Sequence, residues 1–120
     1  MKNKICTSIE QSKKLIELGI DINSADLVVI DIPFQGGDRF KFIRIKFPND
    51  IFPSITDGKS ELIPAWSLSA LLDVYPMTVG RDMDMYCCWQ NSKNLHSRHY
   101  DNPVDACYEM ILKLHEQKLL

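Results

Sequence analysis

Cysteine and histidine side chains gather in one short stretch of the sequence, at Cys87, Cys88, His96 and His99. These two residue types form the ligand set that zinc prefers in proteins. Their spacing does not favour a shared ion, because neighbouring residues of a strand point to opposite faces, and so do residues three apart. We therefore expect a buried Cys87, an outward Cys88 and surface histidines, with no metal or cofactor bound.

A catalytic cysteine is the second candidate. Such a nucleophile needs a neighbour that lowers the pKa of its thiol. Cys88 lies opposite His96 or Arg98 if the two segments pair as a hairpin, and Cys6 lies just before a predicted helix. Cys107 falls on the apolar stripe of another predicted helix. None of the three belongs to a recognisable nucleophile motif, so we expect structural thiols and predict no catalytic residue.

Three further patterns resemble catalytic or phosphate-binding motifs, but each has a simpler structural explanation. Asp82 and Asp84 would share one face of a strand, roughly 7 Å apart, a spacing that acid–base hydrolysis uses but that is ordinary on a solvated strand. The pair Gly36-Gly37 precedes a strand instead of a helix, so it predicts a hairpin turn and not a phosphate loop. Ser67 and Ser69 lie on a predicted helix without a nucleophile elbow around them.

A basic strand is the one pattern that bears on nucleic acid. Cations for phosphates and rings for bases are what a sheet uses to bind a single strand. Protection of sheet edges from aggregation is the commoner reason for lysines on strands, and we expect the phenylalanines in the core instead of on a stacking platform. Nucleic-acid binding is therefore the alternative function. Its candidate residues are Arg39, Lys41, Arg44 and Lys46, which interleave with Phe40, Phe42 and Phe47.

Four aromatic residues are the candidate anchors for a protein partner, since aromatic side chains are enriched at interface centres. They are Trp66, Tyr75, Tyr86 and Trp89. Trp66 is the first choice among them. The partner itself cannot be read from the sequence, and a homodimer is one option.

The composition is that of an ordinary globular domain. The chain has 120 residues, a net charge of -2, 45% hydrophobic residues and 25% charged residues, which predicts a single domain over residues 1–120. No signal peptide and no apolar run of membrane-spanning length is recognised. We therefore expect a cytoplasmic protein with free thiols, and its slightly acidic balance argues against a general polyanion binder.

Three helices are predicted, and they position many of these residues. The first covers Ser8 to Leu18, with Thr7 and Glu10 or Ser8 and Gln11 as its capping box. Gly19 follows it as a left-handed terminator. The second covers Pro64 to Val74, with Pro64 in its first turn. The third begins at Asp101 or Asn102, with Asn102 as a candidate N-cap and Pro103 at the first helical position.

Four strands are predicted between the helices, at Leu27–Ile32, Phe40–Phe47, Val79–Gln90 and Leu95–Tyr100. The alternation slips between Phe42 and Ile43, which indicates a bulge or burial on both faces. Each pair of strands forms a hairpin in the simplest reading. The expected fold is a two-layer α+β domain of order α-β-β-α-β-β-α, with three helices on a mostly antiparallel four-stranded sheet.

The predicted helices carry a resemblance to a known group of proteins. The segments TSIEQSKKLIELGIDINSADL, IPAWSLSALLDVYP and PVDACYEMILKLHEQKLL resemble a family of small proteins without an assigned activity, encoded by gut bacteria, their phages, prophages and other mobile DNA. The resemblance covers roughly half of the chain and implies no site residue. It implies a phage-associated accessory protein.

The leading functional hypothesis is therefore a non-enzymatic protein–protein interaction module of phage or mobile-element origin. Nucleic-acid binding through residues 39–47 is the first alternative, and a thiol- or metal-dependent enzyme is the second. The role of residues 31–61 stays open.

Overall fold

The computed structural model describes residues 4–33, 37, 39–50, 54–56, 60–90 and 94–119. Two compact units make up the chain: one consists of residues 8–66, and the other of residues 1–7 and 67–120. The predicted single domain stays a prediction. In the described part of the chain, no helix combines the length and the apolar character that crossing a bilayer requires.

The residue 8–66 unit begins with α1 (Ile9–Glu17), followed by the short 3-10 helix η1 (Ile22–Ser24). Ser8 caps α1 and forms a reciprocal capping box with Gln11, which confirms the second of the two predicted boxes. Gly19, with a φ of 91°, ends the helix. The amide of Ile20 then bonds the carbonyl of Leu15 at 3.1 Å, which closes the last turn as the sequence predicts.

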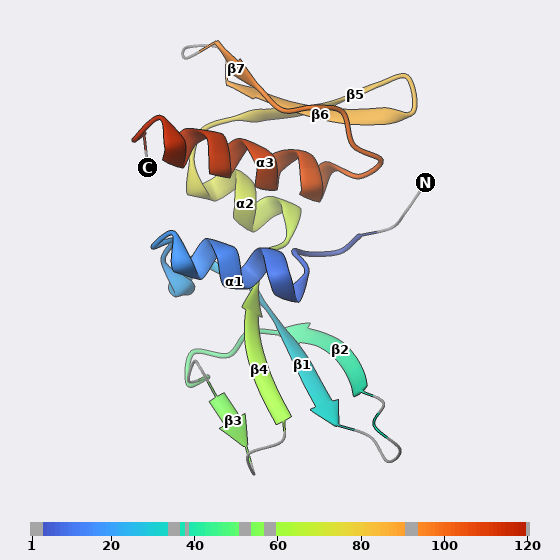
Figure 1. Ribbon diagram of the computed structural model, residues 1–120, viewed down its shortest axis with the longest axis vertical. Helices are drawn as coiled ribbons and strands as arrows, with labels where there is room; N and C mark the ends of the chain where they lie inside the picture. The colour runs from blue at the N-terminus through green and yellow to red at the C-terminus, as the bar shows by residue number, and fades with distance from the viewer. Residues whose placement is uncertain are drawn as a thin grey trace. The chain divides into compact units, whose positions relative to one another are not determined.

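The sheet of this unit has the order β2-β1-β4-β3, with β1 (Leu27–Pro33) and β4 (Ser60–Ala65) inside and β2 (Arg39–Ile45) and β3 (Ser54–Thr56) at its edges (Figure 1). All pairings are antiparallel. The predicted interior strand and its hairpin with the basic strand are confirmed. The pairing runs without interruption from Leu27 opposite Ile45 to Pro33 opposite Arg39, so the strand has no bulge there.

Strand β4 corrects the predicted start of the second helix. Pro64 lies in the strand, opposite Val28 of β1. The amide of Lys46 bonds the carbonyl of Asp26, and the alternation of antiparallel bonds then points the backbone groups of Val28 toward β2. Pro64 therefore faces a position where β1 offers no hydrogen bond, and its missing N–H costs the ladder nothing.

The other unit contains α2 (Leu68–Val74), α3 (Pro103–Glu116) and the sheet β5-β6-β7. Strand β5 (Thr78–Asp82) turns tightly into β6 (Met85–Gln90), which also pairs with β7 (Leu95–His96). The single strand predicted over Val79–Gln90 is therefore a hairpin. Met83 adopts a φ of 58° in its two-residue turn, a conformation that usually takes glycine or asparagine, so the sequence carried no turn signal there.

Helix α3 supplies much of the core of this unit. Asn102 caps it and Pro103 occupies its first turn, as predicted. Its inward face is fully buried at Val104, Ala106, Cys107, Met110, Ile111 and Leu114, and it packs against β6 and α2.

The α+β class with three helices is confirmed, but the single four-stranded sheet is wrong. The first two predicted strands pair with the unpredicted strand β4 and, at its edge, with the three-residue β3. The remaining strands form the separate sheet β5-β6-β7. The observed order of the main elements is α-β-β-β-β-α-β-β-β-α.

Candidate protein-interaction surface

An apolar surface lies on the sheet of the residue 8–66 unit. Five side chains on one face of β1, β2 and β4 form it, and we call them the apolar sheet face: Ile30, Ile32, Phe40, Phe42 and Leu62. They are cross-strand neighbours, because Phe42 and Leu62 both lie opposite Ile30, and Phe40 lies opposite Ile32. Side chains that alternate along each strand bring them to the same side of the sheet.

Two phenylalanines make this face accessible. Phe40 is 52% exposed and Phe42 is 39% exposed, while the other three members are half-buried. The two rings lie 5.8 Å apart between centroids, tilted by 45°. Helix α1 packs against β4 and reaches Glu61, whose side chain points to the opposite face of the strand from Leu62. The helix therefore covers the other face of the sheet.

A partly buried ion pair fixes the end of β2 next to this face. The guanidinium of Arg44 donates to both carboxylate oxygens of Asp50, at 2.7 and 3.0 Å. It also donates to the carbonyl of Ile45 at 2.8 Å and lies 4.7 Å from the ring centre of Phe47. The amide of Phe47 adds a third bond to Asp50. The turn after β2 is thus closed by charge-assisted hydrogen bonds.

This cluster predicts an acid-sensitive unit. The hydrogen bonds from Arg44 and from the Phe47 amide lower the pKa of Asp50 to about 2. A carboxylate with a depressed pKa stabilises the fold fully above its ordinary value, and that stability is lost as the pH falls toward the folded value. The melting temperature is therefore expected to fall between roughly pH 4 and pH 2, and Asp50→Asn should remove part of that fall. Circular dichroism melts across this range measure it.

Glu10→Gln is the matched control, since Glu10 is an exposed acid on α1 of the same unit. Its melting profile should follow that of the unmodified chain. An Asp50→Asn profile that also follows the unmodified chain at every pH would contradict the role given to the Arg44–Asp50 pair.

The basic residues of β2 are not brought together with its rings. Lys41 lies exposed on the face opposite to Phe40 and Phe42, as strand alternation requires. Arg44 shares the ring face but is held by Asp50. Lys46 follows the strand and is half-buried, and the side chain of Arg39 lies outside the described part of the structure. The exposed cation Lys41 therefore lies on the opposite side of the sheet from the two rings.

The four predicted aromatic anchors are at most partly accessible. Trp66 is fully buried, and its indole N–H donates to the Ser24 hydroxyl at 2.8 Å. Tyr75, Tyr86 and Trp89 are half-buried. The Trp89 indole lies directly on Gly80, where an added Cβ would meet it at 2.7 Å. These contacts favour packing roles, and Trp66 offers no surface to a partner.

The thiols are placed differently from the prediction. Cys88 is fully buried and lies 3.7 Å from the sulfur of Cys107, while Cys87 is half-buried. The predicted inward Cys87 and outward Cys88 are thus reversed, because the turn at Met83 changes which side of β6 faces α3. The hydrogen bond with Cys107 and burial raise the pKa of the Cys88 thiol, the opposite of what a nucleophile needs.

The predicted surface histidines are confirmed, since His96 and His99 are both exposed. His99 lies 3.6 Å from the carboxylate of Asp82. Across the described ranges, no three potential metal ligands come together.

The remaining candidates do not form a site either. Asp84 belongs to the turn and lies 3.2 Å from Arg81, so it does not share a strand face with Asp82 as predicted. Ser67 caps α2 by accepting from the Ala70 amide, and Ser69 is exposed. Gly37 adopts a φ of 88°, and Gly36 lies outside the described residues.

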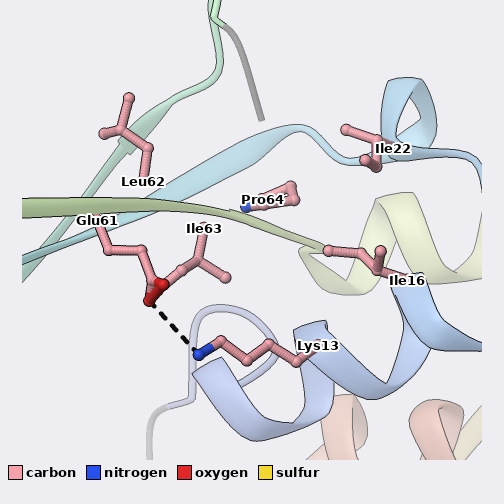
Figure 2. Close-up of a pocket in the computed structure, with 7 residues that line it drawn as sticks. All are labelled: Lys13, Ile16, Ile22, Glu61, Leu62, Ile63 and Pro64. Carbon is pink, nitrogen blue, oxygen red and sulfur yellow. Dashed lines mark ion pairs between the residues drawn. The ribbon is translucent and has the colours of Figure 1, made fainter. Parts of the chain in front are cut away.

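A small pocket lies in the residue 8–66 unit, between α1, η1 and β4. Its volume is about 230 Å³, and its walls are apolar apart from Lys13 and Glu61. Figure 2 shows these two side chains converging from α1 and β4. The Lys13 ammonium lies 3.4 Å from a carboxylate oxygen of Glu61. Their charges neutralise each other, and the pocket is smaller than the roughly 300–1,000 Å³ of typical ligand sites. Nothing in its lining selects a ligand.

Comparison of the chain with protein-family models, curated proteins and solved structures finds no match.

Proposed function

We propose that this chain is a small non-enzymatic binding module whose protein partner covers the apolar sheet face. The observation that carries this proposal is the exposure of Phe40 and Phe42 beside Ile30, Ile32 and Leu62. A cluster of large apolar side chains beside a charged pair, here Arg44 and Asp50, is typical of a recognition surface on a soluble domain.

The sequence resemblance adds a cellular setting to this proposal. Proteins carried by phages and prophages of gut bacteria are the group that the helical segments resemble. We therefore place the chain in the cytoplasm as an accessory protein of mobile DNA. No feature of the described thiols, histidines or acids supports an enzymatic role in its place.

Nucleic-acid binding remains the alternative, and the geometry of β2 gives it less support. A single-strand binder stacks bases on rings while nearby cations hold the phosphates. Here Arg44, the cation on the ring face, is already paired with Asp50. Lys41 is accessible but belongs to the other face.

A paired capture experiment tests the proposed function. The unmodified chain and the double variant Phe40→Ser and Phe42→Ser are immobilised, and proteins captured from the lysate of the source cells are quantified by mass spectrometry. At least one protein should be retained by the unmodified chain and reduced about tenfold or more by the variant, since two aromatic anchors contribute more than 1.4 kcal/mol together.

The matched control is Met83→Asn, which removes an apolar side chain that is 89% exposed in the other unit. It should retain the same protein. Equal capture by the unmodified chain and the double variant, with both folded by circular dichroism, would rule out the apolar sheet face as the binding surface.

A further inference from the structure

We infer that the partner binds by adding an extended acidic strand to the free edge of β2, an inference that rests on the proposed function. Strand β2 is the last strand of its sheet, and in the described part of the chain nothing pairs with its outer side. An exposed edge of this kind is a template for strand addition, in which backbone bonds supply affinity and side chains supply specificity.

The register identifies which backbone groups are free. The amide of Lys46 donates to the carbonyl of Asp26, so this pair belongs to the hydrogen-bonded set of the β1–β2 ladder. Alternation along an antiparallel ladder then turns the N–H and C=O groups of Lys41, Ile43 and Ile45 away from β1. Arg44 already occupies the Ile45 carbonyl, so the open edge is centred on Lys41 and Ile43.

The side chains along this edge are suited to a strand that is partly apolar. Phe42, Ile43 and Ile45 are 39%, 42% and 69% exposed. Phe42 points to one face of the sheet, and Ile43 and Ile45 point to the other. A strand laid along the edge would cover apolar side chains on both faces, whereas a ligand lying on the apolar sheet face alone would leave Ile43 and Ile45 uncovered.

Charge determines the type of strand that fits. Across the sheet, Glu61 lies opposite Asp31, and Asp31 lies opposite Lys41. This row of charged residues ends on a cation at the edge, and Lys41 makes no ion pair with any described residue. Opposite charges directly across a ladder are favourable and like charges are not. The next position outward therefore favours a glutamate or an aspartate.

The same charges disfavour a second copy of this chain as the occupant. Two β2 edges would bring both copies of Lys41 and Lys46 into one seam. Lysines on an edge commonly prevent such self-pairing. An acidic partner converts this repulsion into attraction, which gives specificity as well as affinity.

Fluorescence anisotropy of labelled peptides on the full chain tests the inference. The probe is a fluorescein-labelled peptide about six residues long that alternates glutamate with valine, and the control peptide carries lysine in place of glutamate. We expect the acidic peptide to bind and the basic peptide to bind at least fivefold more weakly. Lys41→Glu should weaken the acidic peptide about two- to fivefold.

The variant Ile43→Pro removes an outward N–H without removing a hydrogen bond to β1, because this residue does not donate to β1 in the ladder derived above. It should retain the fold and bind the acidic peptide about tenfold more weakly, whereas Ile43→Ala, which keeps the N–H, should lose less. If the proline variant does not fold, a probe with N-methylated valines replaces it. That probe should bind the unmodified chain about tenfold more weakly than its parent.

Four results would overturn the inference: no binding of the acidic peptide at concentrations up to about 1 mM, equal binding of both peptides, binding of an oligothymidine instead, or a dimer that Ile43→Pro dissociates. A captured partner lost with the Phe40 and Phe42 double variant, together with no peptide binding, would retain the proposed function and remove strand addition alone. Peptide binding without any captured protein would retain strand addition at the β2 edge and remove the proposed function.

Discussion

Trp66→Ala is expected to lower the free energy of unfolding by about 3–5 kcal/mol, the usual cost of deleting a large buried aromatic side chain. The Trp66 side chain is fully buried, and its N–H donates to Ser24. The Ser24 hydroxyl donates in turn to the carbonyl of Asp21. The variant would leave a cavity and remove one bond from the turn that precedes β1. Trp66→Phe should cost less, because most of the volume is kept.

The two tryptophans allow this variant to test the single-domain prediction as well. Trp66 belongs to the residue 8–66 unit and Trp89 to the other unit. In Trp66→Ala, fluorescence during urea unfolding comes from Trp89 alone, while circular dichroism reports all helices. If residues 1–120 unfold as one domain, both signals should shift together to lower urea. A Trp89 transition that stays at its original midpoint would show that the units unfold independently. A loss below about 1 kcal/mol would contradict the role of Trp66 in the core.

The helices were predictable because their signals are local. Ser8 with Gln11 and Asn102 with Pro103 each occupy positions that cap a helix whatever the rest of the chain does. Pro64 was misleading, because a proline at a helix start and a proline in a strand without a donor partner look the same in sequence. The second helix was therefore predicted to begin within β4.

The division into two sheets could not be predicted in the same way. Strand β1 pairs directly with β4, although β2 and β3 lie between them in the sequence. Nothing in either segment specifies a partner that is so distant along the chain. The turn at Met83 lacks the glycine or asparagine that usually marks a hairpin. Without that signal, the sequence pattern predicts a single strand over β5 and β6. The side chains of Cys87 and Cys88 are then predicted to point to the wrong sides of that strand.

The candidate surface was missed for a related reason. Hydrophobicity predicts core positions for Phe40 and Phe42, but burial depends on which elements cover each face of a sheet. Their spacing of two residues did place them on one face. That β2 is an edge strand, and that α1 covers the opposite face, depends on contacts that sequence spacing does not contain.

Asn102→Ala is expected to lower the free energy of unfolding by about 2 kcal/mol, near the upper end for the loss of an N-cap. The Asn102 side chain accepts from the amide of Asp105 at 2.8 Å and donates to the carboxylates of Asp101 and Asp105, at 2.9 and 2.8 Å. Asp105 also forms a 2.7 Å ion pair with Lys4. Alanine would leave a partly buried amide without its acceptor and both acids without this donor, so several groups lose a partner at once.

Asn102→Ser separates these contributions, because serine is also a good N-cap but cannot donate to two acids as an amide does. Urea unfolding followed by circular dichroism should rank the unmodified chain first, the serine variant next and the alanine variant last. Equal losses in the two variants would mean that the amide contacts to Asp101 and Asp105 dominate and the cap itself contributes little. Because α3 supplies much of the core of its unit, the cap stabilises β6 and α2 as well as the helix that it starts.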